Sequence, residues 1–166
     1  MMAYSNAKKF YKNAIECAGV ALVNNGRIFL VCPFYNYRPQ DYAIPKGHVE
    51  KGEDRESAAR REFTEETGID ISSIPLDFLC KVRTQIDEDT VKLVTVYRGE
   101  GAGDEKFKGA NLADNGSPEN IMGEYIRFED AIQLIVPYQR PVVAKLMGRE
   151  IEDFGEFLDE KLKEIM

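Results

Sequence analysis

The chain has 166 residues and carries 22 Lys plus Arg against 29 Asp plus Glu, which gives a formal net charge of −7. This is the length of one ordinary domain, and 43% hydrophobic residues exceed what a disordered chain contains, so we expect a single domain over residues 1–166. The negative charge repels polyanions at long range, and no run of about 18 apolar residues occurs, so neither a nucleic-acid partner nor a membrane-spanning helix is expected.

Residues 1–16 are expected to form an N-terminal extension, because they lack the uninterrupted apolar run of a signal peptide. Cys17, Cys32 and Cys80 are an odd number of cysteines and show no C-x-x-C spacing. This pattern is typical of a reduced protein rather than of a thiol metal site or a redox motif. We therefore expect a cytoplasmic protein.

The first regular structure that the sequence predicts is a β-hairpin. Two apolar runs, 17–23 and 28–32, flank the segment Asn24-Asn25-Gly26-Arg27. Asn-Gly tolerates the positive φ angles of a tight turn, so the two runs should pair as antiparallel strands. A loop rich in proline and aromatic residues follows.

A helix is predicted over residues 54–67, where helix formers occur without Pro or Gly, and Gly68 stands where a C-cap glycine would. At 100° per residue, Glu62, Glu65 and Glu66 share one face of this helix. Like charges at these spacings destabilise a helix by roughly a few tenths of a kcal/mol per pair, and a divalent cation would relieve the repulsion. Oxygen ligands without His or Cys at matching spacing indicate Mg²⁺ or Mn²⁺ rather than zinc.

Further strands are predicted at about 76–86 and 91–98, where the second run alternates clearly. Residues 99–120 are polar and glycine-rich and should form a long loop, which is either functional or a surface insertion. A strand at 124–128 and a short helix at 129–136 follow.

The last predicted element is an amphipathic helix over residues 141–166. Pro141 can occupy its first turn. Apolar residues recur at spacings of three and four, at Val143, Leu146, Met147, Ile151, Phe154, Leu158, Leu162 and Ile165. The helix would pack on its own domain or, at its far end, on a second copy, so a homodimer through this helix is one expected assembly.

Residues 47–69 resemble the box of the Nudix hydrolase family, G-x5-E-x7-R-E-U-x-E-E-x-G-U, in which U is a bulky apolar residue. Every specified position is filled, by Gly47, Glu53, Arg61, Glu62, Phe63, Glu65, Glu66, Gly68 and Ile69. The resemblance implies an α+β fold, an α/β/α sandwich with a mixed β-sheet between helices, to which the long C-terminal helix is added. It also implies Mg²⁺-dependent hydrolysis of a phosphoanhydride bond in a nucleoside diphosphate linked to another moiety.

The same resemblance implies the metal ligands. Glu62, Glu65 and Glu66 would bind Mg²⁺, for which Mn²⁺ is a possible substitute. The backbone carbonyl of Gly47 would join them. Glu53 would orient the helix or bind the metal through water.

The resemblance also implies the groups that support the chemistry. Arg61 would hold a box glutamate in place through a charge-assisted hydrogen bond. A base must take a proton from the attacking water. Glu62 or Glu65 would serve from within the box, and Glu119 or Glu124 are the alternatives from outside it.

The segment before the box, Tyr42-Ala-Ile-Pro-Lys-Gly-His-Val, is similar to the lead-in of Nudix enzymes that cleave dinucleoside polyphosphates and diphosphoinositol polyphosphates. Lys46 would contact a phosphate, or be a solvated lysine of the turn. Tyr42 would stack on a nucleobase or serve the core. The remaining phosphates would be bound by cations chosen from Arg38, Lys81, Arg83 and Lys92.

Among possible substrates, dinucleoside polyphosphates are favoured. The alternatives are a nucleoside triphosphate pyrophosphatase that sanitises the nucleotide pool, a diphosphoinositol polyphosphate hydrolase, and a non-catalytic Nudix module that senses a ligand. The intact R-E-U-x-E-E run argues against the sensing module, since loss of those glutamates would have favoured it.

Overall fold

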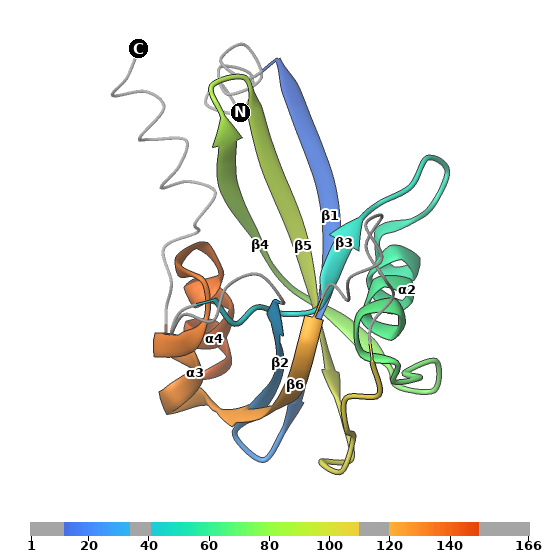
Figure 1. Cartoon of the computed structure of the whole chain (residues 1–166), viewed down its shortest axis with the longest axis vertical. Helices are drawn as coiled ribbons and strands as arrows, with labels where there is room; N and C mark the ends of the chain where they lie inside the picture. Colours follow the sequence, from blue (N-terminus) through green and yellow to red (C-terminus); the bar gives the residue numbers. More distant parts are fainter. Residues whose placement is uncertain (1–11, 34–40, 110–119, 150–166) are drawn as a thin grey trace.

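The structure is a computed structural model that describes residues 12–33, 41–109 and 120–149. Strands dominate the first half of the chain and short helices end it (Figure 1). The elements, in chain order, are β1 (Asn13–Asn24), β2 (Arg27–Pro33), β3 (Lys46–His48), α2 (Arg55–Thr67), β4 (Leu76–Asp87), β5 (Thr90–Glu100), β6 (Asn120–Arg127), α3 (Phe128–Leu134), the 3-10 helix η1 (Pro137–Gln139) and α4 (Arg140–Leu146).

The six strands form one mixed sheet in the order β4-β5-β1-β2-β6, with β3 paired to β1 outside this path. β1 runs parallel to β5 and antiparallel to β2 and β3. Along β1 the antiparallel partner changes: Cys17 lies opposite His48 of β3, whereas Val23 lies opposite Ile28 of β2. This change of partner brings β3 beside the middle of β1, directly before the box helix.

Helices cover both faces of the sheet: α2 lies on one face, and α3 and α4 lie on the other (Figure 1). Side chains alternate along β1, so Ala18 and Val20 pack with Phe63 of α2, while Ala21 packs with Val143 of α4. We call these the α2 face and the α3/α4 face. The predicted α/β/α sandwich is confirmed.

Local sequence signals account for the hairpin and for α2. Asn25 and Gly26 have φ angles of 46° and 73°, as a two-residue type I′ turn requires. Asp54 caps α2 by accepting a hydrogen bond from the Ser57 N–H at 2.8 Å, and Gly68 ends the helix with a φ of 75°. The predicted hairpin and helix are thus confirmed. β1 begins earlier than predicted, at Asn13, so part of the expected N-terminal extension belongs to the sheet.

The C-terminal helix is not continuous over residues 141–166 as predicted, because α4 ends at Leu146. The N–H of Gly148 donates to the carbonyl of Lys145 at 3.0 Å, and the N–H of Arg149 donates to that of Ala144 at 3.1 Å. These are the two bonds of a Schellman motif, and Gly148 supplies its left-handed residue with a φ of 76°. The apolar spacing continues across this stop and conceals it. Residues 150–166, and with them the expected dimer contact, lie outside the described residues.

The loop after β5 is described over residues 101–109, and 110–119 fall outside the described part. The Glu105 carboxylate accepts hydrogen bonds from two N–H groups of the loop, at 2.8 and 2.9 Å, and from the Tyr125 hydroxyl of β6 at 2.8 Å. The N–H of Lys108 then donates to the last carbonyl of α2 at 2.8 Å. This loop therefore connects β6 to the C-terminal end of the box helix.

Cys17, Cys32 and Cys80 are buried as thiols. Burial raises the pKa of the Cys17 and Cys32 thiols, so both stay protonated near neutral pH. No helix within the described ranges is long and apolar enough to cross a membrane.

Candidate active site

Gly47 of β3 lies directly against the box helix. Its partner in β1 is Ala18, which packs on the α2 face, so the α-carbon of Gly47 is directed toward α2. A Cβ at Gly47 would overlap with Cδ and both carboxylate oxygens of Glu62. Glycine at this position therefore leaves the space that the Glu62 carboxylate occupies.

Arg61 organises the carboxylates around it. Its Nε and Nη2 donate to the two oxygens of Glu53 at 2.9 Å each. Its Nη1 donates to Glu62 at 2.9 Å and to Glu65 at 3.1 Å, and Nη2 also donates to the carbonyl of His48 at 2.9 Å. All five guanidinium N–H groups are used. The expected charge-assisted bond from Arg61 to a box glutamate is present, together with a bidentate bond to Glu53.

These contacts fix the charges of the pair at neutral pH. Hydrogen bonds from Arg61, and then from the N–H of Glu50, hold the pKa of Glu53 at about 2. The bond to Glu53 raises the pKa of Arg61 above its usual value, although partial burial opposes this. Glu53 therefore fixes the position of Arg61, which in turn fixes Glu62 and Glu65.

The third box carboxylate, Glu66, joins α2 to the lead-in. The N–H of Lys46 donates to Glu66 Oε2 at 3.1 Å. The Lys46 side chain is directed to the other face, because its partner Gly19 shares the α3/α4 face with Cys17. Burial lowers the pKa of Lys46, but Tyr138 and then Glu66 raise it by more than burial lowers it. The pKa is therefore above its usual value, and the side chain stays an ammonium ion.

A second ammonium lies close to Lys46. Lys92 of β5 is paired with Ile15 of β1 and alternates with Val94, which places it on the α3/α4 face. Burial and then the charge of Lys46 lower the pKa of Lys92. Two cations therefore lie on the same face of the sheet, on either side of β1.

Arg83 and Lys81 do not share this position. Arg83 is paired with Leu93, and its neighbour Val82 is buried on the α3/α4 face, so Arg83 is directed to the α2 face. Lys81 has the same orientation. Of the four cations named as candidates for the remaining phosphates, Lys92 shares the face of Lys46, and Arg38 lies outside the described residues.

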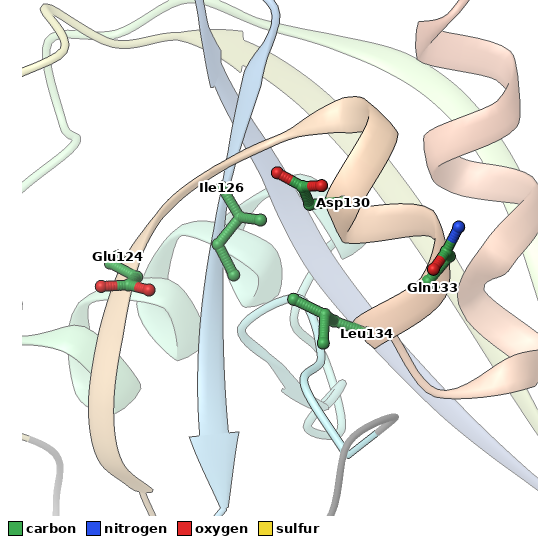
Figure 2. Close-up of a pocket in the computed structure, with 5 residues that line it drawn as sticks. All are labelled: Glu124, Ile126, Asp130, Gln133 and Leu134. Atoms are coloured by element: carbon green, nitrogen blue, oxygen red, sulfur yellow. The ribbon is translucent and has the colours of Figure 1, made fainter.

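Tyr42 packs into the core on the α3/α4 face, with its hydroxyl 3.9 Å from the sulfur of Met122. Glu124 is directed to that same face of β6, where it lines a pocket of about 390 Å³ beneath α3 (Figure 2). The pocket is lined by Glu124, Ile126, Asp130, Gln133 and Leu134. The structure thus separates Glu124 from the box carboxylates, which lie along α2, and Glu119 falls outside the described ranges.

Two residues close to Lys46 were not among the predicted site residues. Tyr138 and Gln139 lie in η1, and Gln139 is fully buried although it is polar. Gln139 Oε1 accepts a hydrogen bond from the N–H of Ile44 at 2.9 Å, across 95 residues of sequence. Sequence carries only a weak signal for them, the aromatic residue that follows Pro137 in a turn.

The donor atoms of the box suit a hard cation. Glu53, Glu62, Glu65 and Glu66 offer carboxylate oxygens, and the carbonyl of Gly47 adds a neutral one. Among the residues that the structure describes, no group of three or more His, Cys, Asp or Glu side chains is arranged to hold a metal ion as it stands. Arg61 bonds to three of these carboxylates, so a cation would have to share or replace some of those bonds.

Comparison with known proteins identifies the family of the chain. The NUDIX domain profile matches residues 15–146. Nudix hydrolase 25 of Arabidopsis thaliana is 29% identical to this chain over 163 residues, and the match covers 86% of each protein. An RNA pyrophosphohydrolase of Erythrobacter litoralis is 27% identical over 140 residues, and that match covers 76% of this chain and 84% of the relative. The fold is similar to that of a C. elegans Ap4A hydrolase, with a TM-score of 0.59, 22% identity and coverage of 81% and 96% of the two chains. Because the NUDIX domain match spans most of its length, the chain belongs to the Nudix hydrolase family.

Proposed function

We propose that this protein is a divalent-metal-dependent pyrophosphohydrolase that cleaves dinucleoside polyphosphates. One observation carries the proposal: the backbone of Lys46 is bonded to Glu66, while its side chain is directed to the other face of the sheet, which Lys92 shares. Lys46 therefore connects the carboxylates of the α2 face, which suit a cation, with a cationic side chain on the α3/α4 face, which suits a phosphate. A polyphosphate needs both kinds of group.

Glu62, Glu65 and Glu66 would hold Mg²⁺ or Mn²⁺, with the carbonyl of Gly47 and with Glu53 directly or through water. A bound divalent cation would neutralise phosphoryl oxygens and lower the pKa of a water molecule. The space between Gly47 and Glu62 keeps one carboxylate close to the backbone that leads into the box.

The protein's own side chains would carry the remaining steps. The oxygen of a water molecule attacks phosphorus, the bridging P–O bond breaks, and the water proton passes to a box carboxylate, Glu62 or Glu65. Arg61 holds both carboxylates by hydrogen bonds, so their orientation is set before substrate arrives. Lys46 and Lys92 would bind phosphate oxygens that do not react.

Two cationic side chains on one face, Lys46 and Lys92, favour a substrate with several phosphates, which supports dinucleoside polyphosphates over a substrate with a single pyrophosphate. The similar C. elegans structure is that of an Ap4A hydrolase. A second candidate substrate is the 5′-terminal pyrophosphate of an RNA, since the E. litoralis relative is named an RNA pyrophosphohydrolase. The net charge of −7 opposes extended contact with an RNA chain, so we rank this second.

A substrate panel with product analysis tests the proposal. It should contain diadenosine tetraphosphate, nucleoside triphosphates, ADP-ribose, a diphosphoinositol polyphosphate and a 5′-triphosphorylated RNA, each with Mg²⁺ and with chelator. We expect the highest kcat/KM on diadenosine tetraphosphate. A clear preference for the RNA would select the second candidate, and no turnover of any compound would reject catalysis in favour of ligand sensing.

Substituting the box carboxylates tests the residue assignment. Glu62→Gln and Glu66→Gln should each lower kcat by about 100-fold or more, because each removes a ligand charge, while the circular dichroism spectrum stays unchanged. Glu56→Gln is the matched control, since Glu56 lies on the same helix but pairs with Arg60 at 3.9 Å. Near wild-type turnover in either box variant would show that the assigned cation site is wrong.

A further inference from the structure

Gln139 is a buried polar side chain between the lead-in to the box and the helices of the α3/α4 face. Its side chain is 0% exposed. Its Oε1 accepts a hydrogen bond from the N–H of Ile44, and its Nε2 donates to the Tyr138 hydroxyl, each at 2.9 Å. A buried amide is unfavourable without hydrogen bonds, so these two contacts hold the side chain in one orientation.

The lead-in is tied to the same segment at a second place. The N–H of Tyr42 donates to the carbonyl of Leu134 at 3.2 Å, and the N–H of Val136 donates to the carbonyl of Tyr42 at 2.8 Å. At Ile44, two residues after Tyr42, the backbone N–H donates to Gln139. Lys46 follows two residues after Ile44. The direction in which the chain enters β3 is therefore set from the α3/α4 face.

Tyr138 carries the Gln139 contact to the face of the sheet that Lys46 shares. Its half-buried ring packs against the core of the α3/α4 face, the face that Lys46 shares. The amide of Gln139 thus holds the Tyr138 hydroxyl on the face to which the Lys46 side chain is directed.

We propose that Gln139 is a positioning residue that sets the reach of Lys46 toward the substrate phosphates, through the backbone at Ile44 and the hydroxyl of Tyr138. This inference rests on the proposed function, because it takes Lys46 as a phosphate contact. Gln139 is fully buried and does not itself touch substrate. Its loss should weaken polyphosphate binding and raise KM, and it should leave kcat nearly unchanged.

Binding of inorganic tripolyphosphate, measured by calorimetry, tests the inference without requiring turnover. Gln139→Leu keeps a similar volume and removes both amide contacts, and it should weaken binding by about five- to tenfold, with KM raised to match and kcat within about threefold. Gln133→Leu makes the same replacement at an exposed glutamine of α3 and should change neither quantity. In a Lys46→Ala background, Gln139→Leu should add less than about twofold, because it acts through the missing ammonium.

Tyr138→Phe keeps the Ile44 contact and removes only the hydroxyl, so it serves if Gln139→Leu does not fold. It should weaken binding by about two- to fivefold, again with little effect when Lys46 is absent. Effects that multiply with Lys46→Ala, or an unchanged affinity, overturn the inference, as does a wild-type protein that does not bind tripolyphosphate. A protein that binds tripolyphosphate through coupled Gln139 and Lys46, but hydrolyses nothing, would refute the proposed function alone.

Discussion

Replacing Gly47 by alanine should lower kcat/KM by about 100-fold and leave the fold intact. The new Cβ would overlap with Cδ and both oxygens of Glu62. Restoring a carbon–carbon contact of about 3.5 Å would move the carboxylate by more than about 1 Å. The displaced group is the end of a flexible side chain, and Gly47 is not among the residues with positive φ. We therefore expect the free energy of unfolding to change by less than about 1 kcal/mol.

The catalytic effect should be far larger, because a displacement of about 1 Å can lower a rate about 100-fold, or about 2.7 kcal/mol. The assay compares kcat/KM of Gly47→Ala and wild type at saturating Mg²⁺, with urea unfolding of both proteins. In a Glu62→Gln background the substitution should add little, since the carboxylate that it displaces has already been replaced. A kcat/KM close to wild type, or a loss that multiplies with Glu62→Gln, would refute the reasoning.

Three further predictions concern the groups that support the site. Arg61→Lys replaces five donors in a fixed fork with three, so kcat/KM should fall by about 10- to 100-fold. Steady-state kinetics that show no loss would contradict the organising role of Arg61. The pKa of Glu53 is lowered from 4.5 to about 2, so its contribution to stability is complete above pH 4.5 and is lost as the pH falls toward 2. Urea unfolding of wild type and Glu53→Gln should therefore converge over that range, whereas a constant difference would be evidence against the pair. Glu105→Ala removes the acceptor for Tyr125 and for two loop N–H groups, and it should lower the free energy of unfolding by about 1–3 kcal/mol. Tyr125→Phe, which removes one of these bonds, should lower it by less. Equal stability of Glu105→Ala and wild type would reject the anchoring of the loop.

Elements governed by neighbouring residues could be predicted from the sequence. Asp54 and Gly68 bound α2 because capping depends on a few adjacent backbone groups. Asn25 and Gly26 set the hairpin in the same way. Gly148 follows the same rule as Gly68, but the apolar spacing on both sides of it outweighed the signal, and the predicted helix was too long.

Features that depend on strand order could not be predicted. Lys92 and Lys46 share a face of the sheet because both β5 and β3 pair with β1 and because their β1 partners, Ile15 and Gly19, lie on the same side of that strand. A shift of one residue in register would have directed Lys92 to α2, and no local pattern sets that choice. For the same reason the sequence could not predict the faces to which Arg83 and Glu124 are directed. In the structure Arg83 is on the α2 face, opposite the Lys46 side chain, and Glu124 is on the α3/α4 face, opposite the box.

The crowding of glutamates on one face of α2 predicts a repulsion that a cation would relieve, and in the structure protein groups already relieve part of it. Arg61 donates hydrogen bonds to Glu62 and Glu65, and Glu66 accepts one from the N–H of Lys46. The box helix can therefore fold before any metal binds. The carboxylates keep unused lone pairs, since each oxygen accepts two hydrogen bonds or metal contacts. Arg61 carries one positive charge against the three carboxylates that it bonds, so the cluster stays negative, and a phosphoanhydride would add to that charge. In the proposed function, a divalent cation would offset this excess when substrate binds.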